Sequence, residues 1–220
     1  MADVAANVSA IRSAIDAVAM EHVDIMAVTK RHTPEEINPL AQTEIVHIGE
    51  NRVQEFMEKR EKLDPRFKPH IIGQLQRNKV KYIIECVEMI ESVDRLELAQ
   101  EIDRQAQMHG VVMPVLIQVN LAREEQKGGV YIEDYETLLD SASRLPGIRI
   151  SGLMATMPNV EDVESIRPLF REMRNMFISE RDRARQGVDM RVLSMGMTHD
   201  YLIAASEGAT QVRLGHAIFG

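Results

Sequence analysis

The chain has 220 residues, of which 45% are hydrophobic and 27% charged, as is typical of one soluble globular domain. Its 34 acidic and 26 basic residues give a formal net charge of −8, which argues against general nucleic-acid binding, because phosphate contacts need a basic surface. The one cysteine, Cys86, excludes an intramolecular disulfide and a cysteine-rich metal site. No apolar run reaches the about 18 residues of a membrane span. The N-terminus lacks the features of a signal peptide, so we expect a cytoplasmic protein.

The chain opens with an amphipathic helix, because the apolar residues from Val4 to Val18 step by three and four positions and share one helix face. An apolar strand follows at 24–30. The next helix begins at Thr33-Pro34, where a capping residue precedes a proline in the first turn. A second apolar run at 44–49 repeats the pattern of strand after helix.

Short apolar runs continue to alternate with helical patterns to the end of the chain. The predicted strands span 24–30, 44–49, 68–73, 87–93, 113–120, 148–154, 191–195 and 211–215, and further helical patterns lie at 94–109, 131–145, 163–177 and 201–206. This alternation predicts a parallel sheet with helical crossovers, and eight strands are the number that closes a (β/α)8 TIM barrel. An open, doubly wound sheet is the alternative. Because no linker-like segment interrupts the pattern, we predict a single domain over residues 1–220, with an extra N-terminal helix.

Functional groups of a (β/α)8 barrel lie at the C-terminal ends of its strands, so the residues that follow each strand are the candidates. Lys30 ends the first strand on the same pleat side as Met26 and Val28. An apolar barrel interior would lower the pKa of this lysine, and its free amine would attack carbonyl groups, as Schiff-base formation requires. The alternative is a lysine that lies beyond the strand and points to solvent.

The loops after the seventh and eighth strands suit a phosphate dianion. The segment Ser194-Met-Gly-Met-Thr198 offers hydroxyls and exposed N–H groups, and Gly215-His216 comes from the next loop. Many barrels bind phosphate with these two loops, although serine and glycine are also ordinary turn residues. Arg213 lies opposite the apolar face of the eighth strand, where an interior guanidinium needs an acid partner or a ligand. An outward-facing, solvated arginine is the alternative.

The seven histidines show no metal-ligand spacing, and no zinc-protease motif or nucleophile elbow is present. We interpret His47 and His70, which lie within strands, as interior histidines with hydrogen-bond partners. The charged run from Glu180 to Arg185 is interpreted as a solvated helix face.

From about Ile25 to Gly220 the chain resembles the pyridoxal phosphate homeostasis protein family. The matching motifs are, in order, Ala27-Val-Thr-Lys30, Gly49-Glu-Asn51, His70-Ile-Ile-Gly-Gln-Leu-Gln-Arg-Asn-Lys79, Ile117-Gln-Val-Asn120, Lys127-Gly128-Gly129, Gly152-Leu-Met154, Leu193-Ser-Met-Gly-Met-Thr198 with Asp200, and Val212-Arg-Leu-Gly-His-Ala-Ile-Phe-Gly220. Each motif alone is modest, and the last two are the most specific. Their joint occurrence in this order is a strong signal.

The resemblance implies a barrel like the barrel domain of alanine racemase, with pyridoxal 5′-phosphate held by Lys30 as an internal aldimine. It implies that Asn51 lies beside this cofactor and Arg213 near its pyridine nitrogen. A cation there disfavours protonation of the ring nitrogen and weakens the ring as an electron sink. The resemblance places five residues around the phosphate: Ser194, Gly196, Thr198, Gly215 and the backbone of His216.

Four features depart from the family pattern. Arg52 stands where an aromatic or apolar residue is usual, and His199 stands where an acidic residue is frequent. His216 replaces a small residue, commonly threonine, in the phosphate loop. The chain also stops at Phe219-Gly220, without a further helical tail. We therefore expect the eighth helix to be missing and the N-terminal helix to cover that part of the barrel.

These features lead to the hypothesis of a pyridoxal phosphate binder for intracellular cofactor homeostasis and supply, without catalytic turnover and in transient contact with apoenzymes. Alanine racemase-like enzymes use a second domain that supplies a catalytic tyrosine, and one barrel leaves no room for it. One alternative is a small pyridoxal phosphate-dependent racemase, with His70 as its second proton-transfer group. Another is a cofactor-free Schiff-base aldolase. We expect a monomer with no metal and with no nucleic-acid or membrane partner.

Overall fold

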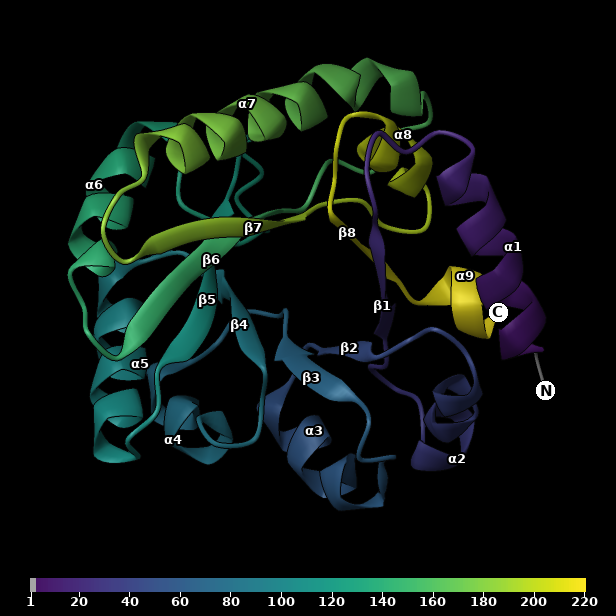
Figure 1. Cartoon of the computed structure of the whole chain (residues 1–220), viewed down its shortest axis with the longest axis horizontal. Coiled ribbons are helices and arrows are strands. Elements are labelled where there is room, and N and C mark those ends of the chain that lie inside the picture. Colours follow the sequence, from purple (N-terminus) through teal and green to yellow (C-terminus); the bar gives the residue numbers. More distant parts are fainter. Residues whose placement is uncertain (1–2) are drawn as a thin grey trace.

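The computed structural model describes residues 3–220, and within them eight parallel strands pair in chain order to form a closed barrel (Figure 1). The last strand pairs with the first, with Met26 opposite Arg213. The strands are β1 (Asp24–Val28), β2 (His47–Glu50), β3 (Lys68–Ile71), β4 (Met89–Val93), β5 (Met113–Val119), β6 (Ile148–Ala155), β7 (Val188–Ser194) and β8 (Gln211–Leu214). The predicted (β/α)8 barrel is confirmed, and closure excludes the open, doubly wound sheet.

The helices lie around the outside of the barrel (Figure 1). The predicted helix start at Thr33 is present. The Thr33 backbone N–H donates to the Glu36 carboxylate, and Pro34 occupies the first turn. The α-helices are α1 (Val4–Asp16), α2 (Pro34–Ile37), α3 (Val53–Lys59), α4 (Val80–Ile83), α5 (Leu96–Met108), α6 (Ile132–Ser143), α7 (Arg167–Arg183), α8 (Tyr201–Ser206) and α9 (His216–Phe219), and the short 3-10 helices are η1 (Asn38–Gln42), η2 (Arg60–Lys62), η3 (Arg77–Lys79) and η4 (Val163–Ile166).

The main apolar core lies between the strands and the helices, where large side chains such as Phe56, Ile102 and Phe170 are buried. A second, smaller apolar cluster is formed by Met89, Leu116 and Met154. The strands carry apolar residues on almost every position, because both faces of a parallel sheet are covered. Polar residues of the strands are nevertheless buried as well, and these form the network described below.

The join between β8 and β1 is covered by α1 and α9, which lie side by side (Figure 1). The buried face of α1 consists of Val8, Ile11 and Ile15. The side-chain amide of Asn7 donates to the carbonyl oxygen of Ile218 in α9 at 2.9 Å. The predicted covering role of the N-terminal helix is confirmed. The expectation that the eighth helix is missing needs correction, because a single helical turn follows β8 and provides the surface on which α1 packs.

The charged run at the end of α7 is solvated from Arg181 to Ala184, as expected, but the interpretation fails for Glu180. Glu180 is only 3% exposed and forms ion pairs with Arg183 at 2.7 Å and Arg185 at 3.5 Å. Arg185 also reaches Asp140 of α6 at 3.0 Å. The end of α7 packs on α6, and a carboxylate buried there needs cationic partners.

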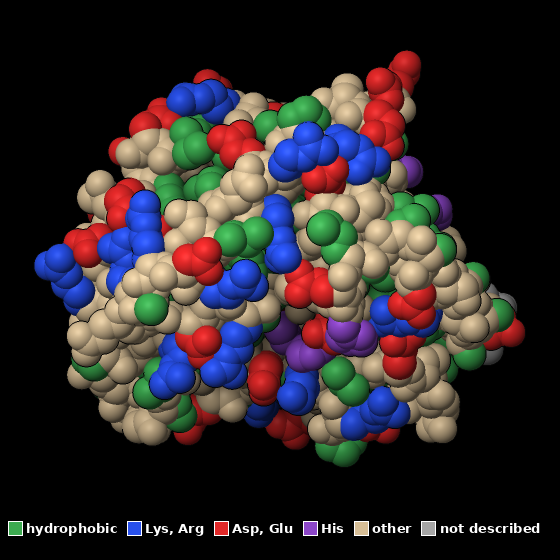
Figure 2. Space-filling view, turned by 45° about the horizontal axis from the view of Figure 1, so that its top comes forward, with side chains coloured by type: hydrophobic (Ala, Val, Ile, Leu, Met, Phe, Trp, Pro, Cys, Tyr) green, Lys and Arg blue, Asp and Glu red, His purple; other side chains and the backbone are tan. Residues whose placement is uncertain are grey.

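The face of the molecule in Figure 2 carries acidic and basic side chains interspersed, with histidines gathered near a hollow. Within residues 3–220 we find no helix with both the length and the apolar character required to cross a bilayer.

Candidate functional site

A cavity of about 420 Å³ opens at the C-terminal ends of β1 and β8. Five of the eight predicted site residues line it: Lys30, Thr198, Arg213, Gly215 and His216. A larger cavity, of about 790 Å³, lies beside the N-terminal ends of β6 and β7, near Pro146 and Gly187. Because function in a (β/α)8 barrel lies at the C-terminal ends of the strands and the opposite end serves stability, the smaller cavity is the candidate site.

Lys30 lies two residues beyond the end of β1, where its side chain is exposed and lines the cavity. Met26 is completely buried, and Val28 lies at the cavity wall. The expectation that Lys30 follows Met26 into the barrel interior is therefore wrong, because the strand ends before the lysine. The amine stands at the opening of the barrel, where a ligand in the cavity can reach it.

The loop that carries Lys30 is held by hydrogen bonds from Lys59 of α3. The Lys59 ammonium donates to the carbonyl oxygen of Thr29 at 2.7 Å and to that of His32 at 3.2 Å. It also pairs with the buried carboxylate of Glu50 at 2.7 Å. Burial raises the pKa of Glu50, although the hydrogen bond from Lys59 opposes this effect. Lys59 thus holds both sides of the segment in which Lys30 stands.

Sequence reasoning missed Lys59, although a signal was present. Val53 and Phe56 lie on the buried face of α3, and Lys59 follows at the same spacing of three. A lysine on the apolar face of a helix is a candidate for a buried charge with specific partners.

The loop between β7 and α8 is a tight turn that presents Thr198 and His199 to the cavity. Asp200 closes this turn, because its carboxylate accepts from the Met197 N–H at 2.5 Å. Burial raises the pKa of Asp200, and the hydrogen bond from Met197 opposes this effect. Gly196 has a φ of +97°, and a Cβ there would lie 2.6 Å from the Ala204 Cβ. Gly196 does not line the cavity. Its lack of a side chain lets α8 pack closely against the turn.

Gly215 lies on the cavity wall between β8 and α9. Its φ of −109° suits any residue, and a Cβ would meet only Val28, at 3.4 Å or more. The fold therefore does not require glycine at this position, and its effect is to keep the cavity wall free of a side chain. His216 is exposed on the same wall, at the start of α9. At the start of α8, the N–H groups of Asp200 and Tyr201 donate to the Met197 carbonyl oxygen. The first N–H groups of α9 have no partner within that helix.

Arg213 is 5% exposed and points into the barrel, so the solvated alternative is excluded. Its guanidinium donates to the Ser194 hydroxyl and to the Ala155 carbonyl oxygen, both at 2.7 Å. Burial lowers the pKa of Arg213, while the negative charges of Glu91 and Asp200 raise it. Arginine stays charged even where it is buried. The floor of the cavity therefore carries a fixed cation. Acidic groups lie near it, but no carboxylate is bonded to the guanidinium directly.

Two further predicted residues lie away from the cavity wall. Ser194 is completely buried, and its hydroxyl is bonded to residues of the barrel interior. Asn51 is half-buried in the loop after β2 and does not line the cavity. Conversely, Lys127 lines the cavity, and its ammonium donates to the Met157 carbonyl oxygen at 2.6 Å. Three basic side chains, Lys30, Lys127 and Arg213, thus line the cavity, against one acidic side chain, Asp200. Lys127 is paired with Glu124 at 2.6 Å, and the remaining excess of basic groups favours an anionic ligand.

The interpretation of His47 and His70 as interior histidines is confirmed. His70 is 1% exposed, and its ring bonds to Glu91 at 2.7 Å and to His47 at 2.9 Å. His70 does not line the cavity. No three histidine, cysteine or acidic side chains of residues 3–220 are grouped so that they could hold a metal ion.

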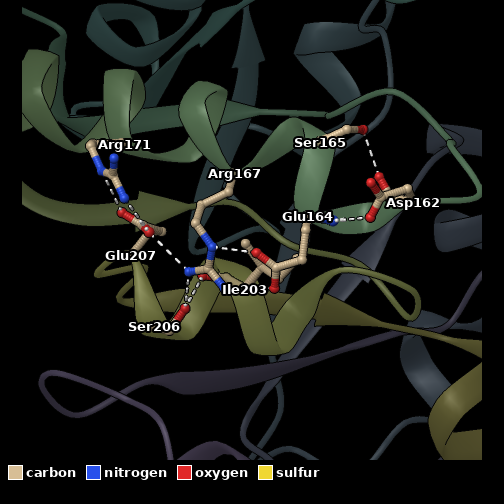
Figure 3. A network of polar contacts seen from close by, with 8 residues as sticks. All are labelled: Asp162, Glu164, Ser165, Arg167, Arg171, Ile203, Ser206 and Glu207. Carbon is tan, nitrogen blue, oxygen red and sulfur yellow. Dashed lines mark hydrogen bonds and ion pairs between the residues drawn. The ribbon is translucent and has the colours of Figure 1, made fainter.

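The outer wall of the cavity is clamped to α8 by a polar network (Figure 3). Val163 and Ile166, which belong to η4, line the cavity. The neighbouring Arg167 donates to Glu164 at 2.6 Å and, across to the end of α8, to Ser206 and Glu207 at 2.9 Å each. The clamp keeps the apolar wall at a fixed distance from the turn that presents Thr198.

Comparison with known proteins places this geometry in a family. The family model of the alanine racemase N-terminal domain matches residues 1–220. A pyridoxal phosphate homeostasis protein of Aquifex aeolicus (strain VF5) is 41% identical over 199 residues, which are 89% of this chain and 86% of the relative. The protein of the same name from Escherichia coli (strain K12) is 31% identical over 100% of this chain and 97% of its own length.

Solved structures agree. PipY of Synechococcus elongatus PCC7942, in its structure with PLP bound, is 31% identical, with a TM-score of 0.88 over 99% of this chain and 100% of that chain. Alanine racemase of Clostridium difficile 630 has a TM-score of 0.74 at 17% identity, covers 97% of this chain and 56% of that chain, and supports the fold alone. The chain belongs to the alanine racemase N-terminal domain family and, within it, to the pyridoxal phosphate homeostasis proteins.

Proposed function

We propose that the protein binds pyridoxal 5′-phosphate in the cavity beside Lys30, holds it covalently through the Lys30 amine as a Schiff base, and keeps it available for apoenzymes without catalytic turnover. One observation carries the proposal: a single cavity brings together an accessible amine, a buried guanidinium and the starts of two helices. The names of the relatives, and the PLP-bound structure of PipY, support the choice of cofactor.

The residues on the cavity wall fit the cofactor. When bound, pyridoxal phosphate supplies an aldehyde, which condenses with primary amines. Thr198, Gly215 and the backbone of His216 would hold the phosphate dianion, because hydroxyl and N–H donors at helix starts favour anions. Arg213 would face the ring nitrogen and disfavour its protonation. Gly196 would serve by shaping the turn. Asn51, which lies in the loop after β2 and outside the cavity wall, would have to turn toward the cavity to border the ring.

The geometry favours binding over racemase catalysis. The racemase alternative needs His70 as a second proton-transfer group, but this side chain is buried and bonded to Glu91 and His47. Lys30 is exposed at the cavity mouth. An open site suits uptake and release of a reactive aldehyde better than a reaction that requires exclusion of water. The aldolase alternative does not account for a cavity that carries both the helix starts and Arg213.

A titration tests the proposal. The purified protein, Lys30→Ala and the control Lys68→Ala would each be titrated with pyridoxal 5′-phosphate and followed by visible absorption. Lys68 is exposed at the start of β3, at the opposite end of the barrel. The wild type and Lys68→Ala should develop the same visible band, and Lys30→Ala should not. An unchanged band in Lys30→Ala would contradict attachment at this residue, and failure of the wild type to take up the cofactor would overturn the proposal.

A separate assay tests the absence of turnover. The loaded protein should not racemise L-alanine or other L-amino acids. Its rate of racemisation should equal the background rate measured with Lys30→Ala. Racemisation that requires Lys30 would favour the racemase alternative. Transfer of the cofactor from the loaded protein to an apoenzyme, measured as recovered enzyme activity, would support the supply role.

A further inference from the structure

The interior of the barrel holds a buried carboxylate that the proposed binding site does not use directly. Glu91 lies in β4 and is 0% exposed. Its Oε1 accepts from His70 Nδ1 at 2.7 Å and from Gln211 Nε2 at 2.8 Å. Its Oε2 accepts from the hydroxyl of Ser194 at 2.7 Å. Three donors thus converge on one carboxylate, and burial without them would be costly.

The same hydroxyl links Glu91 to the cavity. Ser194 Oγ accepts from Arg213 Nη1 at 2.7 Å and from Gln211 Nε2 at 2.9 Å. A serine hydroxyl has one donor and two acceptor positions, and all three are now used within the protein. Ser194 therefore has no hydrogen-bonding capacity left for a phosphate group. Its place in the structure is between a buried anion and the cation at the cavity floor.

The protonation state of the network follows from its donors. Burial raises the pKa of Glu91, but the hydrogen bonds from His70 and Ser194 and the positive charge around the carboxylate, including that of Arg213, outweigh this effect and leave the pKa lowered. The carboxylate is therefore ionised and accepts all three hydrogen bonds. The other ring nitrogen of His70, Nε2, lies 2.9 Å from His47 Nδ1. The chain of hydrogen bonds is complete from the half-buried His47 to Arg213.

We propose that Glu91 is a positioning residue, which acts through Ser194 to hold the Arg213 guanidinium in its orientation toward the cavity. The other anchor of the guanidinium is the Ala155 carbonyl oxygen, on the neighbouring side of the barrel. Two anchors on different strands set the plane of the group, which one anchor cannot do. The inference deepens the proposed function and rests on it in one respect: the group that Arg213 faces would be the cofactor ring.

The role differs from simple filling of the barrel interior. Without the carboxylate, Ser194 loses the acceptor that orients its hydroxyl, and the Ser194 anchor of Arg213 is no longer held in one orientation. Hydrogen bonds to charged groups are stronger than neutral ones, so loss of one anchor should be measurable in ligand affinity. The consequence should be local to the cavity floor, because the hydrogen bonds of Glu91 go to His70, Gln211 and Ser194, all within the barrel.

The test compares Glu91→Gln, Ser194→Ala and Ser194→Thr with Glu180→Gln. Glu180 is an equally buried, ion-paired carboxylate in α7, away from the cavity, and controls for general loss of stability. In Glu91→Gln and Ser194→Ala, the dissociation constant for pyridoxal 5′-phosphate should rise about tenfold, and the pH profile of the visible band should shift. Ser194→Thr keeps the hydroxyl and should keep both properties, as should Glu180→Gln. If Glu91→Gln does not fold, the Ser194 pair carries the test.

A second measurement uses the protein without cofactor. The side-chain N–H signals of Arg213 in NMR spectra should exchange slowly with water in the wild type and in Ser194→Thr, and at least tenfold faster in Ser194→Ala. Faster exchange together with failure of the wild type to bind pyridoxal 5′-phosphate would refute the proposed function and leave the positioning role intact. Unchanged exchange and unchanged affinity in both Ser194→Ala and Glu91→Gln would overturn the positioning role.

Discussion

His47 stands at the half-buried end of the interior network, and its titration bears on stability. Burial and the adjacent His70 lower the pKa of His47 below its ordinary value of 6.5. Between the lowered pKa and 6.5, the unfolded chain binds more protons at this position than the folded chain does. The free energy of unfolding therefore falls as the pH drops through that window.

We expect His47→Gln to flatten this dependence. Urea unfolding at about pH 7 and about pH 5.5 should show a smaller loss of stability in His47→Gln than in the wild type. His22→Gln is the matched control, because the His22 side chain is 76% exposed. An equal loss in the wild type and His47→Gln would show that the network does not restrain His47.

Lys59 gives a second prediction at the scale of single residues. Lys59→Met removes the cation that faces the buried Glu50 carboxylate, and breaking such a pair costs about 3–5 kcal/mol. Urea unfolding should show this loss, and adding Glu50→Gln in the same chain should recover part of it. Lys62→Met, at an exposed position, should unfold like the wild type. No recovery in the double variant would argue that the ion pair does not set the cost.

The sequence predicted the individual residues of the site unevenly. Lys30, Arg213 and Gly215 could be identified, because each follows or occupies a strand end where a barrel places its chemistry. The network around Arg213 could not be predicted from the sequence, because Glu91, Ser194 and Ala155 come from three different strands. Hydrophobic periodicity shows that a residue is buried, but it does not show which polar atom lies opposite it.

At the scale of elements, the loops after β7 and β8 use glycine for different reasons. Gly196 combines a positive φ with a close contact to α8, whereas Gly215 has an ordinary φ and open space beside it. Sequence alone could not separate these reasons, since both residues lie in loops of similar composition. Strand starts also differ from the prediction. β2 begins at His47, three residues later than predicted, and β7 begins at Val188, three residues earlier. Apolar flanking residues blur such boundaries.

Alanine substitutions should separate the two glycines. Gly215→Ala should leave stability unchanged or raise it by about 0.4–1 kcal/mol, because the backbone is compatible with alanine. It should weaken pyridoxal 5′-phosphate binding about tenfold, because the new methyl group stands on the cavity wall. Gly196→Ala should instead destabilise the fold itself. Thermal unfolding and cofactor titration distinguish the two, and wild-type affinity in Gly215→Ala would place the phosphate elsewhere.

At the scale of the whole molecule, the alternation of strands and helices predicted a parallel sheet and favoured the closed barrel, but it left the open, doubly wound sheet as an alternative. Eight β-type runs in 220 residues leave few other arrangements of parallel strands. The short turn α9 was not predicted, because the four residues His216–Phe219 are too few to show a helical period. The cavity could not be predicted either, because its outer wall depends on the contacts of Arg167 with α8, which are distant in sequence.

The central claim is that the amine of Lys30 at the mouth of this barrel carries the cofactor. The most direct measurement is reduction of the pyridoxal 5′-phosphate-loaded protein with borohydride, followed by proteolysis and mass mapping of the modified peptide. We expect one equivalent of reduced adduct, on the peptide that contains Lys30. An adduct confined to another lysine, such as Lys127 on the same cavity wall, would contradict it.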